Sequence, residues 1–449
     1  MISFLLAKYL SLAVISARAL LLAALLGPAS YGVLGTLVLA QQNLSYLALG
    51  ARDGLTVKLA QAHNNRERVL LICSSTLFWV WCIGTLILVS SFVLVYVAGK
   101  GNATWVWVGV ISYLSVINEI LVNISRDKDK LLRVVATELT ANSVPLLTAL
   151  AFLHRIDVNV VLMSIAAGLV LSIVIYGIDS RAYTWTLVSG RITRGVIFAG
   201  VQMALMSFVG TSITTVFIFS ANALKLGKTI GLLVFANSLC TIVLYGLNMM
   251  AWAATSSSMK SLYANQSPDG GRGARLRAVF RLGLIVCVSA MLALKVALPF
   301  VLKAYAGSEA FAVYMCLLQS YSLLLYREFN FLAVTSRSLW IAAGYGSVLL
   351  FTIGMVMLFP RVSIILLMQI SLMLLCAISL CCAYICRRLG LRDQRGWPQY
   401  VFLCFPVLFG TGFTTLGVGA AIAVSLTYSV LWLMVDGTIV RGLIARPAT

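Results

Sequence analysis

The sequence predicts an all-α membrane protein that crosses the bilayer about 14 times. Hydrophobic residues make up 61% of the 449 residues and charged residues only 10%, which is more apolar side chain than a soluble core can bury. The apolar residues gather in segments of about 20 residues, the length of a helix that crosses a bilayer. Lys and Arg concentrate in every second loop between these segments, as in polytopic membrane proteins.

The expected helices follow one another along the whole chain. Their approximate ranges are 2–26, 31–50, 70–98, 104–124, 134–153, 159–178, 195–219, 230–253, 279–301, 310–333, 339–359, 363–385, 399–412 and 418–435. The segment 72–98 is hydrophobic at odd and even positions alike, which excludes the alternation of a membrane β-strand. A single helix over 400–436 would be about 55 Å long, too long for a hydrocarbon core of about 30 Å. The glycines between positions 410 and 419 therefore predict a hairpin of two short helices.

The basic residues predict the orientation of the chain. Of the 33 Lys and Arg residues, 23 fall on one side of the predicted membrane, six fall in the opposite loops, and four fall inside spans: Lys8, Arg18, Lys295 and Arg327. Because Lys and Arg of short loops stay on the cytoplasmic side, this asymmetry predicts that both termini are cytoplasmic. Membrane orientation therefore explains the net charge of +20, and nucleic-acid binding is disfavoured.

Residues suited to metal, redox or hydrolytic chemistry are sparse. All ten cysteines lie in or at the ends of apolar spans, and no Cys-x-x-Cys pair occurs. The two histidines, His63 and His154, fall on opposite sides of the predicted membrane, so a Ser/His/Asp set is implausible. No Walker motif is present. We therefore expect a transporter rather than an enzyme, without a metal or cofactor.

A weak internal repeat divides the chain. The segment Tyr31-Gly32-Val33-Leu34 and its helix parallel Ile230-Gly231-Leu232-Leu233 and its helix, at a spacing of about 199 residues. Six spans return the chain to its starting side, so the halves share one orientation and a cavity is expected between them. We expect an N-terminal six-helix lobe over 1–190, a C-terminal six-helix lobe over 191–390, and a terminal helix pair with a cytoplasmic tail over 391–449.

Three segments near the N-terminus resemble a known family. They are Arg18-Ala19-Leu20-Leu21, Leu26-Gly27-Pro28-Ala29-Ser30-Tyr31-Gly32-Val33-Leu34 and Leu49-Gly50-Ala51-Arg52-Asp53-Gly54-Leu55. They look like the opening of the polysaccharide transporters, the O-antigen and exopolysaccharide flippases of the multidrug/oligosaccharidyl-lipid/polysaccharide exporter superfamily. The resemblance implies a two-lobed bundle in the bacterial inner membrane. By alternating access, such a bundle moves an undecaprenyl-diphosphate-linked oligosaccharide from the cytoplasmic to the outer leaflet.

A carrier of a lipid-linked diphosphate needs cations inside the bilayer, because about two negative charges must cross a low-dielectric slab. Arg18 is the leading candidate by its depth, and Lys295 is its counterpart in the second half. The resemblance adds Arg52, and Arg327 is a further candidate. A structural ion pair or a lipid-facing position is the alternative for Arg18 and Lys295. Lys8 and Arg52 lie near the cytoplasmic surface, where snorkelling is the simpler explanation.

Carboxylates and amides inside the spans complete the candidate site. Glu119, Glu138 and Glu328 are candidates for ion pairs, with cations of the other half among the partners, or for coupling to protons. Candidate contacts to sugar hydroxyls are Gln41, Gln42, Asn43, Asn237 and Asn248. Five further intramembrane amides belong to the same group: Asn118, Asn142, Gln202, Gln319 and Asn330. Interhelical hydrogen bonding is an equal alternative for each of the ten.

Two related transporters compete with this interpretation. A lipid II flippase would share the layout and the basic cleft, whereas a multidrug or cation antiporter would need a net acidic cleft. A non-transporting scaffold would leave Arg18 and Lys295 without a reason to be buried. The expected partners are the lipid-linked saccharide, membrane lipids and, further, a polysaccharide polymerase or glycosyltransferases.

Overall fold

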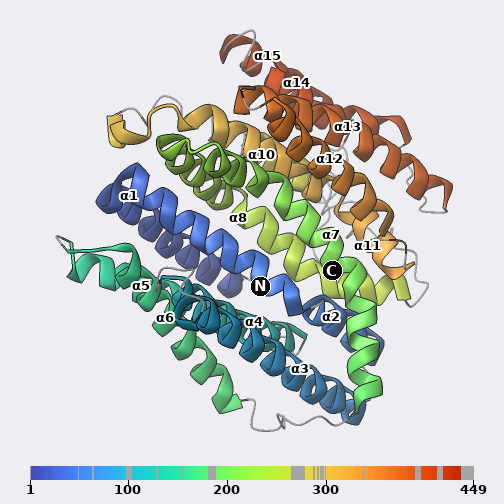
Figure 1. Ribbon diagram of the computed structural model, residues 1–449. Coiled ribbons are helices and arrows are strands. Elements are labelled where there is room, and N and C mark those ends of the chain that lie inside the picture. The colour runs from blue at the N-terminus through green and yellow to red at the C-terminus, as the bar shows by residue number, and fades with distance from the viewer. Residues whose placement is uncertain are drawn as a thin grey trace. The chain divides into compact units, whose positions relative to one another are not determined.

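The computed structural model describes residues 2–435 except 49, 63–64, 98–103, 128–129, 154, 180–188, 264–278, 287–288, 291–292, 294–297, 299, 336, 338, 360, 390–395 and 412–417. Within these residues every regular element is a helix, which confirms the predicted fold class (Figure 1). The chain packs as two compact units, Met1–Phe208 and Val209–Thr449.

The first unit is a bundle of long helices. Its elements are α1 (Ile2–Ser45), η1 (Tyr46–Ala48), α2 (Ala51–Ala62), α3 (Arg66–Phe92), the π-helical turn η2 (Val93–Val97), α4 (Thr104–Asp127), α5 (Leu131–Ala151), α6 (Val158–Asp179) and the beginning of α7 (Gly190–Ala223). Helix α4 packs on α3 and α6, and α5 packs on α1 and α6. Buried aliphatic side chains such as Leu55, Leu77 and Ile120 join α2, α3 and α4 into one core.

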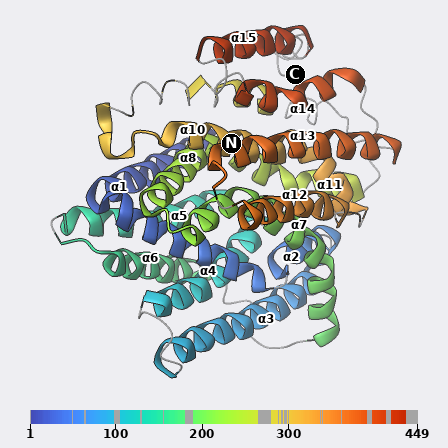
Figure 2. The same cartoon turned by 45° about the horizontal axis from the view of Figure 1, so that its top comes forward.

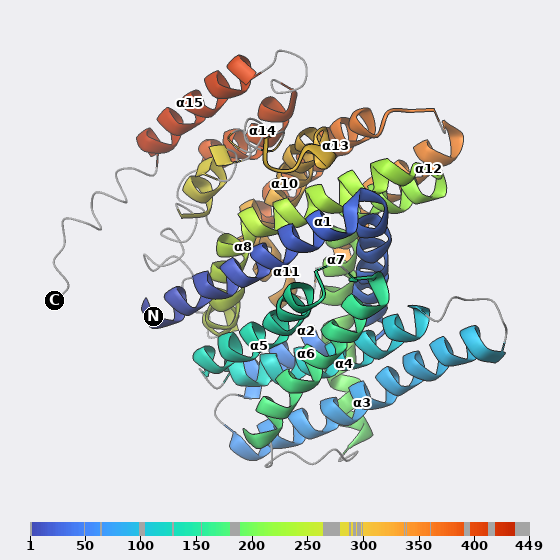
Figure 3. The ribbon, with the colours of Figure 1, turned by 90° about the vertical axis from the view of Figure 1, so that its left-hand side faces the viewer.

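Helix α1 holds the first two expected spans. The backbone leaves the helical region at Gly27 (φ 66°, ψ 170°), and Pro28 follows at once. Glycine adopts a positive φ without steric cost, while proline lacks the N–H that would continue the helix, so the chain bends here. Figure 3 shows the bend in the dark blue ribbon. The expected break between the spans 2–26 and 31–50 is thus confirmed as a bend within α1.

A close crossing of two helices joins the start of α7 to the first unit. Gly50, which directly precedes α2, and Gly54 of α2 face Val196 and Gly200 of α7 so closely that their backbones are in contact. Side chains at these glycines would separate the helices, which is why small residues occupy such crossings in membrane bundles. This contact explains why the first unit extends to Phe208 along α7. The expected lobe boundaries at 190 and 390 stay predictions.

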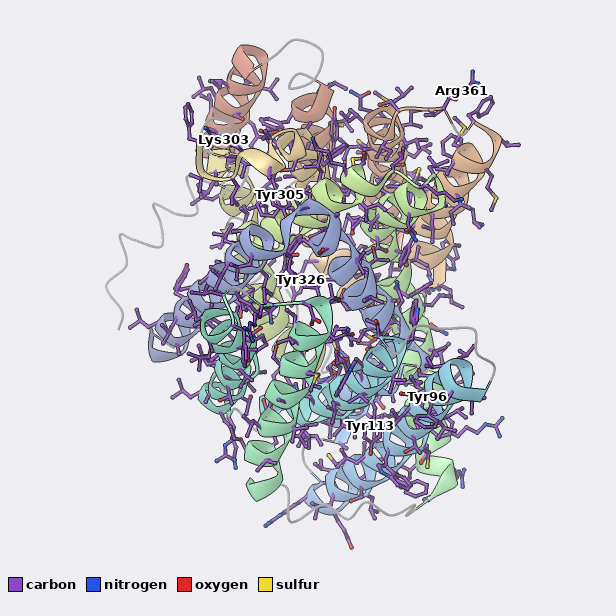
Figure 4. All side chains as sticks on the ribbon, turned by 60° about the vertical axis from the view of Figure 1, so that its left-hand side comes forward. Tyr96, Tyr113, Lys303, Tyr305, Tyr326 and Arg361 are labelled. Carbon is purple, nitrogen blue, oxygen red and sulfur yellow. The ribbon has the colours of Figure 1, made fainter. Side chains whose placement is uncertain are left out.

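The second unit contains the remaining described helices. They are the rest of α7, α8 (Gly227–Tyr263), η3 (Lys303–Tyr305), α10 (Ser308–Leu324), α11 (Tyr326–Val334), α12 (Leu339–Leu358), α13 (Ile364–Arg388), α14 (Gly396–Thr411) and α15 (Val418–Val435). Helix α10 packs on α8, α13 and α14, and Figure 2 shows α12 and α13 side by side. Tyr305, labelled in Figure 4, is buried against Phe235 with 4.3 Å between ring centroids.

The length and hydrophobicity of the helices are those of a polytopic membrane protein. Among the described residues nine helices are long and apolar enough to cross a bilayer, counting bent α1 once. The other five expected spans correspond to the second part of α1, the partly described segment 279–301, the α10–α11 pair, α14 and α15. The last apolar stretch forms two helices, α14 and α15, as predicted, and the turn expected between them lies outside the described residues.

One expected helix is broken. The range 310–333 forms α10 and α11, which meet at Leu325. There the backbone dihedrals (φ −97°, ψ 14°) depart from helical values, although the Leu325 N–H still donates to the Tyr321 carbonyl oxygen at 3.0 Å. The expectation of one continuous helix is therefore wrong at this residue.

Two tyrosines tie α14 to α10. The Tyr314 hydroxyl donates to the Gly410 carbonyl oxygen at 2.9 Å and accepts from Gln369 Nε2 at 2.9 Å. The Tyr321 hydroxyl donates to the Leu403 carbonyl oxygen at 3.0 Å. Both tyrosines are fully buried and lie seven residues apart, on one face of α10. These bonds make α14 an integral part of the second unit.

We expect Tyr321→Phe to lower the free energy of unfolding by about 1 kcal/mol, because one buried hydrogen bond is lost while the ring is kept. The measurement is the Tm of the detergent-solubilised protein. Tyr96→Phe is the matched control, since Tyr96 is exposed and its ring contact with Phe92 needs no hydroxyl (Figure 4). Equal Tm values for the two variants would contradict the tie between α10 and α14.

Candidate functional site

Arg18 meets a neutral partner on a neighbouring helix. It lies inside the first part of α1, partly buried, and its Nη1 donates to Asn142 Oδ1 of α5 at 2.7 Å. Within the part of the chain that the structure describes, Arg18 lies against no carboxylate. Tyr31, from the family-like segment beyond the bend of α1, is close enough to interact electrostatically with this guanidinium.

Asn142 is held by its own helix. Its Nδ2 donates to the Glu138 carbonyl oxygen, one turn earlier on α5, at 2.8 Å. Since Nδ2 is engaged with that acceptor, the amide oxygen is turned toward Arg18. The orientation of the Arg18 partner is therefore fixed by the α5 backbone.

The Glu138 carboxylate lies against the Lys8 ammonium of α1, so the two form an ion pair within the first unit. The snorkelling explanation for Lys8 is wrong, because Lys8 is buried with 6% of its surface exposed. A buried Lys is retained where a carboxylate compensates its charge, and Glu138 does so here. The other half of the protein does not supply this partner.

A second ion pair joins α2 to α4. Arg52 Nη1 lies 3.3 Å from Glu119 Oε2, and both side chains are partly exposed. Arg52 lies on α2, which is not among the candidate spans. The Glu119 carboxylate raises the pKa of Arg52 above its ordinary value, because it stabilises the charged guanidinium.

A further contact between α2 and α4 involves Arg126. Thr56 lies one turn after Arg52 on α2, and its Oγ1 accepts from Nη2 of the buried Arg126 at 2.8 Å. Arg126 lies just beyond the expected span 104–124, so its burial was not predicted.

The charged candidates of the second half are only partly described. Lys295 lies outside the described residues, and so does the side chain of Arg327, whose backbone belongs to α11. Glu328 is buried on α11 with 4% of its surface exposed and interacts electrostatically with Tyr345 of α12 and Cys382 of α13. Glu328 is therefore enclosed by helices of its own unit.

The amide candidates fall into distinct environments. Gln41 is buried and its Nε2 lies 3.4 Å from Ser45 Oγ, whereas Gln42 is exposed and Asn43 is partly buried on α1. On α8, Asn237 Oδ1 accepts from Gln319 Nε2 of α10 at 3.3 Å, and Asn248 is partly buried. Asn237 thus makes an interhelical hydrogen bond, the alternative that the sequence left open, whereas the Gln41 contact stays within α1.

Among the candidate residues of the first unit, three are cations (Lys8, Arg18 and Arg52) and two are carboxylates (Glu119 and Glu138). Glu138 and Glu119 each lie against a cation, Lys8 and Arg52 respectively, whereas the Arg18 guanidinium bonds to an amide. Arg18 takes part in none of the ion pairs formed by the described residues. Among the described residues no three His, Cys, Asp or Glu side chains form a group that could hold a metal ion.

Sequence reasoning found Arg18 by its depth but missed its partner. Asn142 was one of ten candidate amides, and nothing in the sequence distinguished it from the other nine. The only available signal was the spacing of four residues between Glu138 and Asn142, which places both on one face of α5. That spacing does not reveal which helix lies opposite.

No family model and no curated protein matches this sequence. Its structure, however, resembles solved transporters. It resembles the outward-facing conformation of a multidrug resistance MATE family transporter of the MOP superfamily with a TM-score of 0.67 and 10% identity, over 87% of this chain and 97% of that one. The inward-facing conformation of such a transporter gives a TM-score of 0.59 and 12% identity, over 94% and 95%.

A eukaryotic MATE transporter, AtDTX14, gives a TM-score of 0.64 and 11% identity, over 90% of this chain and 96% of that one. Each of these similarities spans nearly the whole of both chains, although identity is low. These three structures are of transporters rather than enzymes. This chain is therefore a multi-pass membrane protein with the fold of the MATE transporters of the MOP superfamily.

Proposed function

We propose that this protein is a flippase that moves an undecaprenyl-diphosphate-linked oligosaccharide from the cytoplasmic to the outer leaflet of a bacterial inner membrane. The observation that carries the proposal is the Arg18 guanidinium, which is inside a membrane helix, partly buried and bonded to a neutral amide. Such a group is costly in a bilayer unless an anion or water reaches it. A diphosphate headgroup supplies that anion.

The fold supports alternating access as the mechanism, since structures of this fold are described as outward-facing and as inward-facing. A membrane potential that is negative inside favours outward movement of an anion by roughly 2.3 kcal/mol per charge per 100 mV. A flippase that exports an anionic substrate can therefore be driven by the membrane potential and needs no ATPase motif.

A multidrug or cation antiporter is the second candidate, because a structural neighbour is described as a multidrug resistance transporter. An organic cation would need a free carboxylate at its site. Glu119 and Glu138 each lie against a basic side chain instead. A lipid II flippase carries the same diphosphate and differs only in the saccharide.

The test is translocation in proteoliposomes of a labelled undecaprenyl-diphosphate oligosaccharide, of lipid II and of the organic cation ethidium. We expect the unmodified protein to move the oligosaccharide lipid, and Arg18→Gln to move it at least about tenfold more slowly, because a charge-assisted hydrogen bond to the diphosphate is lost. Arg361→Gln is the matched control, since Arg361 lies exposed between α12 and α13 (Figure 4).

The outcomes separate the candidates. Equal rates for Arg18→Gln and Arg361→Gln would remove Arg18 from the substrate path. Movement of lipid II in preference to the oligosaccharide lipid would identify the lipid II flippase. Export of ethidium without movement of either lipid would establish the antiporter in place of the flippase.

A further inference from the structure

We propose that Asn142 sets the charge selectivity of the protein, by orienting Arg18 while leaving the Arg18 charge uncompensated. This inference rests on the proposed function, because it assigns a positioning residue to the anion-binding Arg18. The juxtaposition that carries it is a chain of two hydrogen bonds, from Arg18 Nη1 to Asn142 Oδ1 at 2.7 Å and from Asn142 Nδ2 to the Glu138 carbonyl oxygen at 2.8 Å.

The first bond fixes the guanidinium. A flexible Arg side chain loses much conformational entropy when it is held in one geometry, so a partner that holds it beforehand lowers the entropic cost of binding an anion. Asn142 engages Nη1. Guanidinium has five N–H donors in a fixed planar fork, so its other nitrogens can still bind two phosphate oxygens.

The second bond explains why the partner is an amide. An Asp side chain would also accept from Arg18, but it has no N–H for the Glu138 carbonyl oxygen and would neutralise the guanidinium. The carboxylate that does occur on this face of α5, Glu138, lies against Lys8. Where α1 packs on α5, the carboxylate of Glu138 therefore faces Lys8, and the neutral amide of Asn142 faces Arg18.

A purely structural role for Asn142 makes a different prediction. If Asn142 only joined α1 to α5, an Asp at this position would keep the join, because a carboxylate accepts from a guanidinium more strongly than an amide does. Binding of an anion would then be unchanged. If Asn142 sets selectivity, Asn142→Asp keeps the fold and weakens the binding of the anion.

The experiment measures binding of farnesyl diphosphate and of uncharged farnesol to the detergent-solubilised full-length protein, together with the Tm. Asn142→Asp is compared with Asn118→Asp. Asn118 is the matched control, because it is also a partly buried intramembrane amide of the first unit, and its Oδ1 accepts from Ser172 Oγ at 2.8 Å rather than from Arg18. Its candidate role as a sugar contact does not enter this assay, since neither farnesyl probe carries a sugar. Both variants add one negative charge to the same bundle.

We expect the unmodified protein to bind the diphosphate in preference to farnesol. Asn142→Asp should weaken diphosphate binding by about tenfold to a hundredfold, the range for loss of a charge-assisted bond, with a Tm close to the unmodified value. Asn118→Asp should stay within about threefold, since coupling between separated sites is small. In the Arg18→Gln background, Asn142→Asp should have no further effect on diphosphate binding.

Several results would overturn the inference. One is that Asn142→Asp binds the diphosphate with the same affinity as the unmodified protein. That result would leave the flippase proposal intact. Another is an equal loss in Asn118→Asp, which would indicate a general effect of added charge. If Asn142→Asp does not fold, Asn142→Gln replaces it: the neutral variant should keep binding within about threefold, and a loss as large as that of Arg18→Gln would contradict the inference. Failure of the unmodified protein to prefer the diphosphate would instead remove the flippase proposal itself.

Discussion

Gly200→Ala is expected to destabilise the first unit by about 1–3 kcal/mol or more, the range for overpacking of a tight core. A Cβ at position 200 would overlap the Gly50 carbonyl oxygen and would lie 2.5 Å from the Gly54 nitrogen. Both obstacles are backbone atoms, which cannot rotate away as a side chain would. Helices α2 and α7 must therefore separate, and the buried contacts around the crossing are lost. The measurement is the Tm in detergent and the yield of monodisperse protein.

Gly195→Ala is the control on the same helix, because nothing lies within 4 Å of a Cβ built at Gly195. Alanine is a better helix former than glycine by roughly 0.5–1 kcal/mol, so this variant should be neutral or slightly more stable. The two substitutions are chemically identical and are expected to change Tm in opposite directions. A Tm for Gly200→Ala at or above that of Gly195→Ala would refute the close crossing.

Lys8→Met is expected to lower the free energy of unfolding by about 3–5 kcal/mol, the cost of removing one partner from a buried ion pair. Methionine keeps the length of the apolar stem, so the change removes mainly the ammonium that lies against Glu138. The carboxylate then loses the cation that compensates it in a low-dielectric bundle. Thermal unfolding of the purified protein measures the effect.

The double variant Lys8→Met/Glu138→Gln should recover much of this loss, because it removes both charges together. Lys303→Met is the control at an exposed lysine (Figure 4) and should stay within about 0.5 kcal/mol of the unmodified protein. If Lys8→Met behaved like Lys303→Met, Lys8 would be snorkelling to the headgroups, as the sequence had suggested.

Most helices could be predicted because the signal is local. A span of about 20 apolar residues excludes most alternatives, since every backbone polar group in a bilayer must be bonded within the segment. The bend at Gly27 and the division of the last apolar stretch into α14 and α15 were also predictable, because Gly and Pro are local signals that interrupt a helix. The break at Leu325 was missed, since no Pro or Gly marks it.

The candidate site was predictable in its cations but not in their partners. Depth in a span singled out Arg18, because a charge there is expensive wherever the helix packs. The partners lie 70 to 130 positions apart in the sequence: Asn142 bonds to Arg18, Glu138 to Lys8 and Thr56 to Arg126. No local pattern encodes such a pairing.

The sequence by itself determined the fold class, the order of the helices and the presence of an intramembrane arginine, because hydrophobic length and charge act on each segment separately. Only the tertiary structure decided which charges are compensated, since that depends on which helix faces which and at what height. It showed that Lys8 is buried against Glu138 and that Arg18 meets an amide. The energy of a charge in a bilayer depends on its neighbours within a few ångströms, and packing of distant segments supplies those neighbours.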